Sequence, residues 1–471
     1  MAKKGKAGLK SLPSVDKVLK LPEAEALIGK YGRTAATQAI RDAISQVRTG
    51  LLKGDESAAD KCGEKAVIGV AADMADRAIA PRLKRAVNAT GIILHTGLGR
   101  AKMPEAARQA LAGNTGYCNV QMDLDTGERM QRESCLIELV RRLTGAEAAL
   151  VVNNNAGATM LVLRALAQGR EVIVSRGELI EIGGSFRLPE IMAESGAVMR
   201  EVGATNKTHV RDYENAIGPE TALLLKAHKS NYRIEGFTKE VSIADIAKIG
   251  KEHGLPVVDD LGCGALVPLE NYGLEHEMTM RESLEAGSDV VLSSTDKLIG
   301  GPQGGLIIGK GDLLKRIRSN PFYRVLRVGK MTLSALESTL RLFASPEHLN
   351  TTHPVYMMLA KTPGDMKPLA EKLAGRISRK RPEWDVAVVE EKSHLGGGSL
   401  PGSELPSFAV RIRAPGISPG GLARLLRGAP VPIIPHVRED TVLLNMRTVF
   451  EGDLDDIVAG CVDAAEAGAP K

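Results

Sequence analysis

Aromatic residues are scarce in this sequence, and long apolar runs are missing. Phe, Trp and Tyr together make up 3% of the 471 residues, with a single Trp. Because no apolar run reaches about 18 uninterrupted residues, we expect no membrane-spanning helix. The first ten residues carry positive charge but are not followed by an apolar stretch. This pattern argues against a signal peptide, and we expect a cytoplasmic protein.

Cysteine is also sparse. The five cysteines are odd in number, widely scattered and without CxxC spacing: Cys62, Cys118, Cys135, Cys263 and Cys461. This pattern indicates neither a disulfide framework nor a zinc or other metal site, and it fits a reducing compartment. The apolar fraction of 43% and the charged fraction of 25% are ordinary for a globular protein.

Positive charge is concentrated at the N-terminus. Through Lys53 there are eleven Lys and Arg against four Asp and Glu, a balance of +7, whereas the whole chain carries +5. The remainder is therefore about −2, so the basic excess belongs to this segment. Apolar residues between Val18 and Leu51 recur at helical spacing, which predicts about three short helices. We interpret residues 1–75 as a basic helical domain suited to a polyanion.

Residues 76–330 alternate apolar strand candidates with helical patterns. Strands are predicted at 149–152, 171–174, 222–225, 256–258 and 289–292. This alternation is typical of an α/β domain with a mostly parallel, doubly wound sheet. Residues 331–471 contain a helical pattern and then two strand regions, which predicts a small α+β C-terminal domain.

One lysine stands in an unusual place. Lys297 lies between two apolar strand candidates, before the glycine-rich segment 300–305. Burial disfavours the cationic form of a lysine, and such a site suits an amine that forms an imine with pyridoxal phosphate. The hydroxyl of Ser294, three residues earlier, could contact the phosphate of that cofactor. A plain loop lysine is the alternative reading.

Two aspartates end an apolar run upstream. Asp259 and Asp260 precede the glycines of the segment DLGCG, where α/β proteins place their ligands. A carboxylate at this point could keep the pyridine nitrogen of the cofactor protonated. We prefer Asp260 because the following glycines allow a close approach of the backbone. Capping or turn formation remains the alternative for either residue.

Other polar residues follow predicted strands. The backbone N–H groups of Asn154, Asn155 and Ala156 could meet a phosphate at a helix N-terminus. Ser230 and Asn231 could contact the phenolic oxygen of the cofactor, with turn formation as the alternative. Two further arginines, Arg176 and Arg187, could bind substrate or pair with Glu178 and Glu181.

Several long blocks resemble the bacterial selenocysteine synthases, the L-seryl-tRNA(Sec) selenium transferases. The blocks include VNATGIILHTGLGRA (87–101), LTGAEAALVVNNNAGA (143–158), KSNYRIEGFT (229–238) and SSTDKLIGGPQGG (293–305). The resemblance extends from about residue 12 into the C-terminal region. It implies the PLP-dependent transferase fold type I, the class of aspartate aminotransferase, with Lys297 and Asp260 as the cofactor residues.

The resemblance also implies the reaction and the partners. A seryl group on the selenocysteine tRNA would lose its hydroxyl by β-elimination, through an aminoacrylyl intermediate, and then accept selenium from selenophosphate. Arg85, Arg324 and Arg327 would form the selenophosphate site; Arg324 and Arg327 would share one helix face if their segment is helical. The N-terminal domain would bind the tRNA, and the protein would be a homo-oligomer built of dimers, such as a decamer.

Some positions depart from the family pattern. Gly97 stands where Asn is expected, Cys135 where His is usual, and Cys263 where Ser is common. They leave the cofactor assignment intact but keep open a paralogous PLP lyase that acts on a small amino acid or amino sugar acid. A tRNA-binding protein with an inactive cofactor site is a further alternative, which the presence of Lys297 and Asp260 disfavours.

Overall fold

The computed structural model describes residues 9, 11–79, 81–184 and 186–468. The chain folds as two compact units, Met1–Arg85 and Ala86–Lys471. The predicted boundary at residue 75 falls inside a helix that continues to Ile79, so the helical unit is longer than the sequence indicated. Within the described residues, no helix is both long and apolar enough to cross a membrane.

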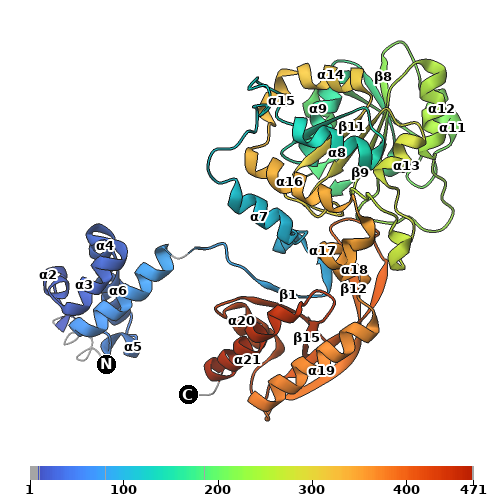
Figure 1. Cartoon of the computed structure of the whole chain (residues 1–471). Helices are drawn as coiled ribbons and strands as arrows, with labels where there is room; N and C mark the ends of the chain where they lie inside the picture. The colour runs from blue at the N-terminus through green and yellow to red at the C-terminus, as the bar shows by residue number, and fades with distance from the viewer. Residues whose placement is uncertain (1–8, 10, 80, 185, 469–471) are drawn as a thin grey trace. The chain divides into compact units, whose positions relative to one another are not determined.

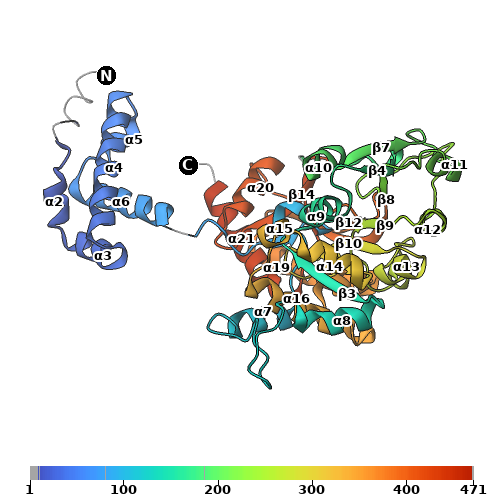
Figure 2. The ribbon, with the colours of Figure 1, turned by 90° about the horizontal axis from the view of Figure 1, so that it is seen from above.

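The first unit is a helical bundle (Figures 1 and 2). Its helices are α2 (Val15–Leu19), α3 (Pro22–Tyr31), α4 (Arg33–Leu52), α5 (Glu56–Ala59) and α6 (Glu64–Ile79). Pro22 occupies the first turn of α3, where a missing N–H costs nothing. Gly32, with φ of +83°, ends α3 and precedes α4. The buried faces of α4 and α6, including Ile40 and Val67, form the core of the bundle.

The second unit contains a seven-stranded sheet with the order β3-β11-β10-β9-β8-β4-β7. Its strands are β3 (Ala148–Val152), β4 (Glu171–Ser175), β7 (Val198–Val202), β8 (Thr221–Ala227), β9 (Val257–Gly262), β10 (Val290–Ser294) and β11 (Gly305–Gly309). β11 runs antiparallel to β10 and β3, whereas β9, β8, β4 and β7 pair in parallel. The predicted mostly parallel sheet is confirmed.

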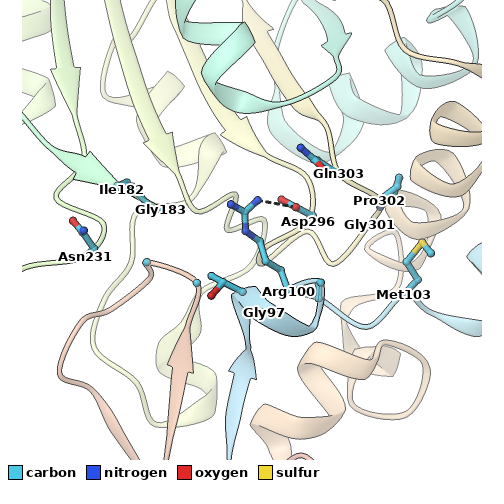
Figure 3. Close-up of a pocket in the computed structure, with 15 residues that line it drawn as sticks. Gly97, Arg100, Met103, Ile182, Gly183, Asn231, Asp296, Gly301, Pro302 and Gln303 are labelled. Atoms are coloured by element: carbon cyan, nitrogen blue, oxygen red, sulfur yellow. Dashed lines mark hydrogen bonds and ion pairs between the residues drawn. The ribbon is translucent and has the colours of Figure 1, made fainter. Parts of the chain in front are cut away.

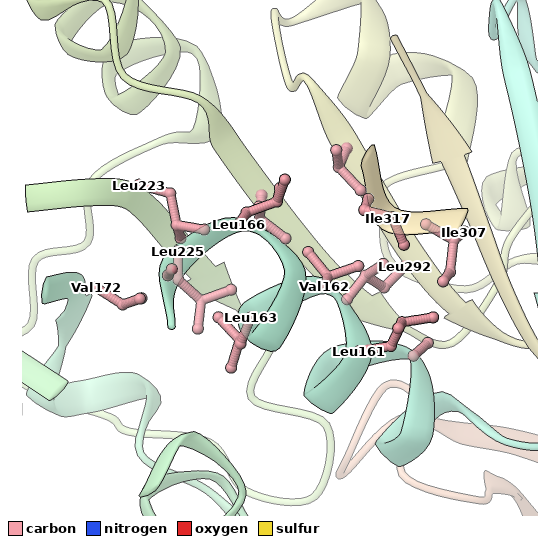
Figure 4. Close-up of a cluster of buried hydrophobic side chains, with 14 of the residues drawn as sticks. Leu161, Val162, Leu163, Leu166, Val172, Leu223, Leu225, Leu292, Ile307 and Ile317 are labelled. Carbon is pink, nitrogen blue, oxygen red and sulfur yellow. The ribbon is translucent and has the colours of Figure 1, made fainter. Parts of the chain in front are cut away.

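Helices cover both faces of this sheet. The apolar side chains of α9 (Asn155–Ala167), including Leu161, Val162 and Leu166, pack on strand residues such as Leu292 and Ile307 (Figure 4). The same face carries α10 (Leu188–Ser195) and α14 (Gly311–Ser319); the other carries α8 (Ser134–Thr144), α13 (Met280–Glu285) and α16 (Lys330–Leu342). The remaining elements of this part are α7 (Glu105–Gly113), α11 (Val210–Glu214), α12 (Ile243–His253), α15 (Pro321–Val325), α17 (Leu349–Thr352), α18 (Pro354–Ala360), and the hairpin of β5 (Glu181–Ile182) and β6 (Phe186–Arg187).

A six-stranded sheet of order β1-β14-β15-β13-β12-β2 forms the C-terminal part. Its elements are β1 (Val87–Ala89), β2 (Ile92–Leu94), β12 (Asp385–Gly396), β13 (Glu404–Arg413), β14 (Ile433–Arg438), β15 (Thr441–Asn445), α19 (Pro363–Lys380), α20 (Pro419–Arg427) and α21 (Leu454–Gly468). Residues 87–94, which the sequence placed in the catalytic domain, pair here in parallel with β14 and β12. Such pairing joins segments about 300 residues apart, and local patterns do not encode it.

Candidate active site

Lys297 lies in a buried turn directly after β10. Its side chain is 5% exposed. Desolvation by burial lowers the pKa of the amine, so its neutral, nucleophilic form is more accessible than in an ordinary lysine. Gly300 closes the turn by donating its N–H to the Lys297 carbonyl, at 3.0 Å. The structure therefore favours a reactive lysine over a plain loop lysine.

Asp260 lies on β9, the strand beside β10. Its Oδ1 accepts a hydrogen bond from Asn155 Nδ2 and its Oδ2 accepts one from Thr159 Oγ1, both at 2.8 Å. Burial raises the pKa of this carboxyl, while the two hydrogen bonds and the charge of Lys297 oppose the rise. The carboxylate is thus held in one orientation by two residues of α9.

Asp259 points to the opposite face of the sheet, as strand alternation requires. Its Oδ2 accepts a hydrogen bond of 2.6 Å from Ser283 Oγ on α13. Burial raises its pKa to about 7. Of the two aspartates, only Asp260 is held by α9 and influenced by Lys297, so the geometry supports the residue that the sequence favoured.

A cavity of about 900 Å³ opens next to the turn that carries Lys297, since Asp296, Gly301 and Gln303 line it (Figure 3). Arg100 and Asp296 lie on its wall and form an ion pair of 2.8 Å between Nη1 and Oδ2. The other lining residues are Thr96, Gly97, Gly99, Ala101, Met103, Ile182, Gly183, Asn231, Gly301, Pro302, Gln303, Gly397 and Gly398. The cavity therefore collects loops from both sheets of the second unit, with a guanidinium and a carboxylate next to Lys297.

Three of the predicted cofactor residues, Ser230, Asn231 and Ser294, lie at different distances from Lys297 and from the cavity. Ser230 is near Lys297: a Cβ added to Gly262 would lie 3.5 Å from Ser230 Oγ and 3.9 Å from Lys297 Nζ. Asn231 lines the cavity and donates to the Glu181 carbonyl at 2.8 Å. Ser294 is buried at the end of β10. The contacts of these three residues with a cofactor stay predictions.

The side chains at the start of α9 make contacts that the sequence did not predict. It does form a helix N-terminus, with Ala156 in the first turn, but Asn154 caps the helix by accepting the Gly157 N–H at 2.7 Å. The side chain of Asn155 binds Asp260, a role that the sequence did not indicate. Thr159 was missed entirely, because a threonine inside an apolar helical run carries no local sign of a polar partner.

The residues present fit pyridoxal phosphate. The buried amine of Lys297 lies near the Asp260 carboxylate, whose two oxygens accept hydrogen bonds from α9. The Oδ1 atom of Asn155 is buried and has no partner among the described residues. An imine-forming amine and a carboxylate for the ring nitrogen are what this cofactor requires. Within the described residues, no group of His, Cys, Asp or Glu is placed to hold a metal ion.

Two of the three arginines predicted to bind selenophosphate, Arg324 and Arg327, are not on the wall of this cavity. Arg324 and Arg327 line a second cavity, of about 540 Å³. They do not share a helix face, because α15 ends at Val325 and Arg327 lies beyond it. Arg85 is the last residue of the helical unit. Arg100, which the sequence reading passed over, is the arginine on the wall beside Lys297.

Other sequence alternatives are resolved by ion pairs. Arg187 pairs with Glu181 at 2.7 Å and with Glu190 at 3.2 Å, and Arg176 pairs with Glu201 at 3.2 Å. The alternative in which these arginines pair with acids is supported, although the partner of Arg176 is Glu201 rather than Glu178.

The three departures from the family pattern lie in different surroundings. Gly97 is on the wall of the cavity. Cys263 is fully buried near Lys297, and burial together with Glu277 holds the pKa of its thiol well above the usual value. Cys135 is exposed in the first turn of α8, outside the cavity wall.

Comparisons with known proteins identify the family of the chain. A family model described as L-seryl-tRNA selenium transferase matches residues 86–450, and one described as selenocysteine synthase N terminal matches residues 9–48. An L-seryl-tRNA(Sec) selenium transferase from Geotalea uraniireducens is 45% identical over 453 residues, covering 96% of this chain and 98% of that protein. One from Carboxydothermus hydrogenoformans is 43% identical over 448 residues, covering 95% and 96%.

A solved structure shows the same fold at low identity. The structure of D-glucosaminate-6-phosphate ammonia-lyase aligns with a TM-score of 0.57 and 21% identity, covering 83% of this chain and all of that one (100%). The predicted fold class, a PLP-dependent transferase of fold type I, is confirmed.

Proposed function

The chain belongs to the L-seryl-tRNA selenium transferase family, and from this premise we propose that it converts L-seryl-tRNA(Sec) to L-selenocysteinyl-tRNA(Sec) with selenophosphate as the selenium donor. The observation that carries the proposal is the buried amine of Lys297, whose pKa burial lowers, near the Asp260 carboxylate, whose two oxygens both accept hydrogen bonds. Both are features of a working cofactor site, so an inactive tRNA-binding protein is the weaker reading.

Each residue of the site has a definite task in this reaction. Pyridoxal phosphate, when bound, supplies the electron sink for loss of the seryl Cα proton and the β-hydroxyl. Lys297 would hold the cofactor through Nζ and would accept the proton from the seryl Cα. Asp260 holds the proton on the ring nitrogen. Asn155 and Thr159 fix the orientation of that carboxylate through its two oxygens.

The remaining cofactor contacts follow from position. We assign the phosphate to the N-terminal turn of α9, where Asn154, Asn155 and Ala156 lie, and to the hydroxyl of Ser294. Ser230 and Asn231, which follow β8, are assigned to the phenolic oxygen. Support for Ser230 is its closeness to Lys297 around Gly262.

Arginines supply the positive charge that a phosphate-type donor needs. Arg100 is on the wall of the cavity, where its partner Asp296 positions the guanidinium. Arg324 and Arg327 lie in the second cavity together with Arg129, Arg132 and Arg318. We propose that a second copy of the chain brings Arg324 and Arg327 to the cavity of its neighbour, in a homo-oligomer built of dimers. The role assigned to Arg85 from the resemblance stays a prediction.

The helical unit is proposed to bind the tRNA. Its basic excess and its match to the selenocysteine synthase N-terminal model support this role. Arg41 and Arg48 are exposed on α4. Because phosphate contacts dominate nucleic-acid affinity, replacing both by Glu is expected to weaken tRNA binding and to reduce its salt dependence.

The direct test is conversion of seryl-tRNA(Sec) in the presence of selenophosphate. The intact protein and Lys251→Ala, a control on the exposed side of α12, are expected to form selenocysteinyl-tRNA, whereas Lys297→Ala is expected to form none. Product from Lys297→Ala would overturn the assignment of the lysine. Absence of product from intact, cofactor-bound protein would instead favour a PLP lyase that acts on a small amino acid or amino sugar acid.

A further inference from the structure

Two buried side chains from another part of the chain hold the backbone just after Lys297. The Tyr356 hydroxyl donates a hydrogen bond to the Leu298 carbonyl at 3.1 Å, and His353 Nε2 lies 2.9 Å from the Ile299 carbonyl oxygen. Both side chains are 0% exposed. They come from α18 and its N-cap, 58 and 54 residues further along the chain. Neither residue has a task in the reaction described above.

The hydrogen bond from His353 has one possible direction. A carbonyl oxygen only accepts, so the hydrogen must be on Nε2. Burial lowers the pKa of the imidazole to about 4, and near neutral pH the ring is therefore uncharged, with its single N–H aimed at the Ile299 carbonyl. His353 and Tyr356 thus donate to two consecutive carbonyls, directly after Lys297.

Packing fixes the two donors. The rings of His353 and Tyr356 meet edge to face with centroids 4.9 Å apart, and the Phe343 ring lies 5.4 Å from the first and 5.6 Å from the second. Further along α18, the Met358 carbonyl accepts a hydrogen bond of 2.8 Å from Arg447 Nη1, in the C-terminal part. The positions of the donors are therefore set by contacts that do not involve Lys297.

The backbone of the turn is held on its other side as well. The Leu298 N–H donates to the Cys263 carbonyl at 3.1 Å, and the Gly300 N–H donates to the Lys297 carbonyl at 3.0 Å. With this backbone fixed, the amine moves by rotation of its own side chain. A displacement of about 1 Å at a reacting group can cost on the order of 10²-fold in rate. The position of the turn therefore decides how well the amine meets the cofactor.

We propose that His353 and Tyr356 are positioning residues for Lys297: their hydrogen bonds to the Ile299 and Leu298 carbonyls place the amine for attack on the aldehyde carbon of pyridoxal phosphate. This step forms a C=N bond between Nζ and that carbon and releases water. The inference rests on the proposed cofactor site and adds two residues to it, which act through the backbone of the turn.

The first measurement is the rate at which apoprotein forms the imine at saturating pyridoxal phosphate, followed by visible absorption. Tyr356→Phe removes one donor and keeps the ring. The rate is expected to fall by about two- to tenfold, the effect of one net hydrogen bond. His353→Leu, which removes the other donor and leaves an apolar side chain in the buried site, is expected to slow the step by a similar factor.

A second measurement separates positioning of the lysine from damage to the pocket. Deoxypyridoxine phosphate has the ring and the phosphate of the cofactor but no aldehyde, so its affinity does not depend on imine formation. Both variants are expected to bind it as tightly as the unaltered protein does. Tyr272→Phe is the matched control, because it removes a hydroxyl from a ring 5.4 Å from that of Tyr356. It is expected to form the imine at the unaltered rate, and urea titration checks the folding of each variant.

An unaltered imine rate in folded Tyr356→Phe would overturn the inference. So would an equal slowing in Tyr272→Phe, or a loss of affinity for deoxypyridoxine phosphate that matches the loss of rate. If His353→Leu does not fold, Tyr356→Phe decides by the same criteria. Failure of the proposed function is distinguishable, because the unaltered protein itself would then form no imine with pyridoxal phosphate.

Discussion

The hydroxyl of Thr159 is expected to set how readily Asp260 ionises. Thr159→Val preserves the shape of the side chain but removes the hydroxyl, which lies 2.8 Å from Asp260 Oδ2 and 3.0 Å from the Asn155 carbonyl oxygen. A hydrogen bond to a charged group contributes about 1.5–3 kcal/mol. Since one pKa unit corresponds to about 1.36 kcal/mol, the pKa of Asp260 should rise by about one to two units. Burial already raises this pKa, so the carboxylate would be lost closer to neutral pH.

The assay is kcat/KM for the conversion of seryl-tRNA as a function of pH. The acid limb of the profile should move up by about one to two units in Thr159→Val, with little change on the alkaline side. Thr144→Val is the control, because Thr144 is also a buried helical threonine that donates to the carbonyl four residues earlier, at 2.7 Å. An acid limb that stays in place, or that moves equally in Thr144→Val, would refute the role of Thr159.

Two further predictions concern stability. Gly300→Ala should destabilise the fold by about 2–4 kcal/mol in a urea titration, because φ is +70° and the new Cβ would lie 2.1 Å from His353 Cε1. The control is Gly375→Ala in α19, which has open space around it and should be neutral or stabilising. Equal effects of the two substitutions on the free energy of unfolding would contradict the packing argument. Asp259 has a pKa raised to about 7, so the native state binds more protons than the unfolded state between about pH 4 and pH 7 and loses stability as pH rises through that window. Asp259→Asn should flatten this dependence, and an unchanged slope of unfolding free energy against pH would show that burial does not perturb Asp259.

Much of the site was accessible from sequence because its signals are local. A lysine between apolar strands and a glycine-rich turn indicates a buried amine, and the structure places Lys297 accordingly. The strand that ends at Asp259 and Asp260 was predicted, but alternation puts the two carboxyls on opposite faces. Only the positions of α9 and α13 decide which face meets the cofactor.

The features that sequence reasoning missed depend on tertiary contacts. Thr159 faces a strand about 100 residues away, and Arg100 pairs with Asp296 across nearly 200 residues. Arg324 and Arg327 were predicted to bind selenophosphate together with Arg85, and within one chain they line a second cavity. The sequence shows that these residues are positively charged. Their position relative to Lys297 depends on how the loops pack and on how copies of the chain assemble.

The central claim is that Lys297 is the residue that carries the cofactor. The most direct measurement is borohydride reduction of the purified protein with bound pyridoxal phosphate, followed by peptide mapping by mass spectrometry. Reduction converts an imine between cofactor and lysine into a stable adduct, and its mass identifies the peptide. We expect a single major adduct on Lys297, absent from Lys297→Ala. A major adduct on any other lysine, or none with the cofactor bound, would contradict it.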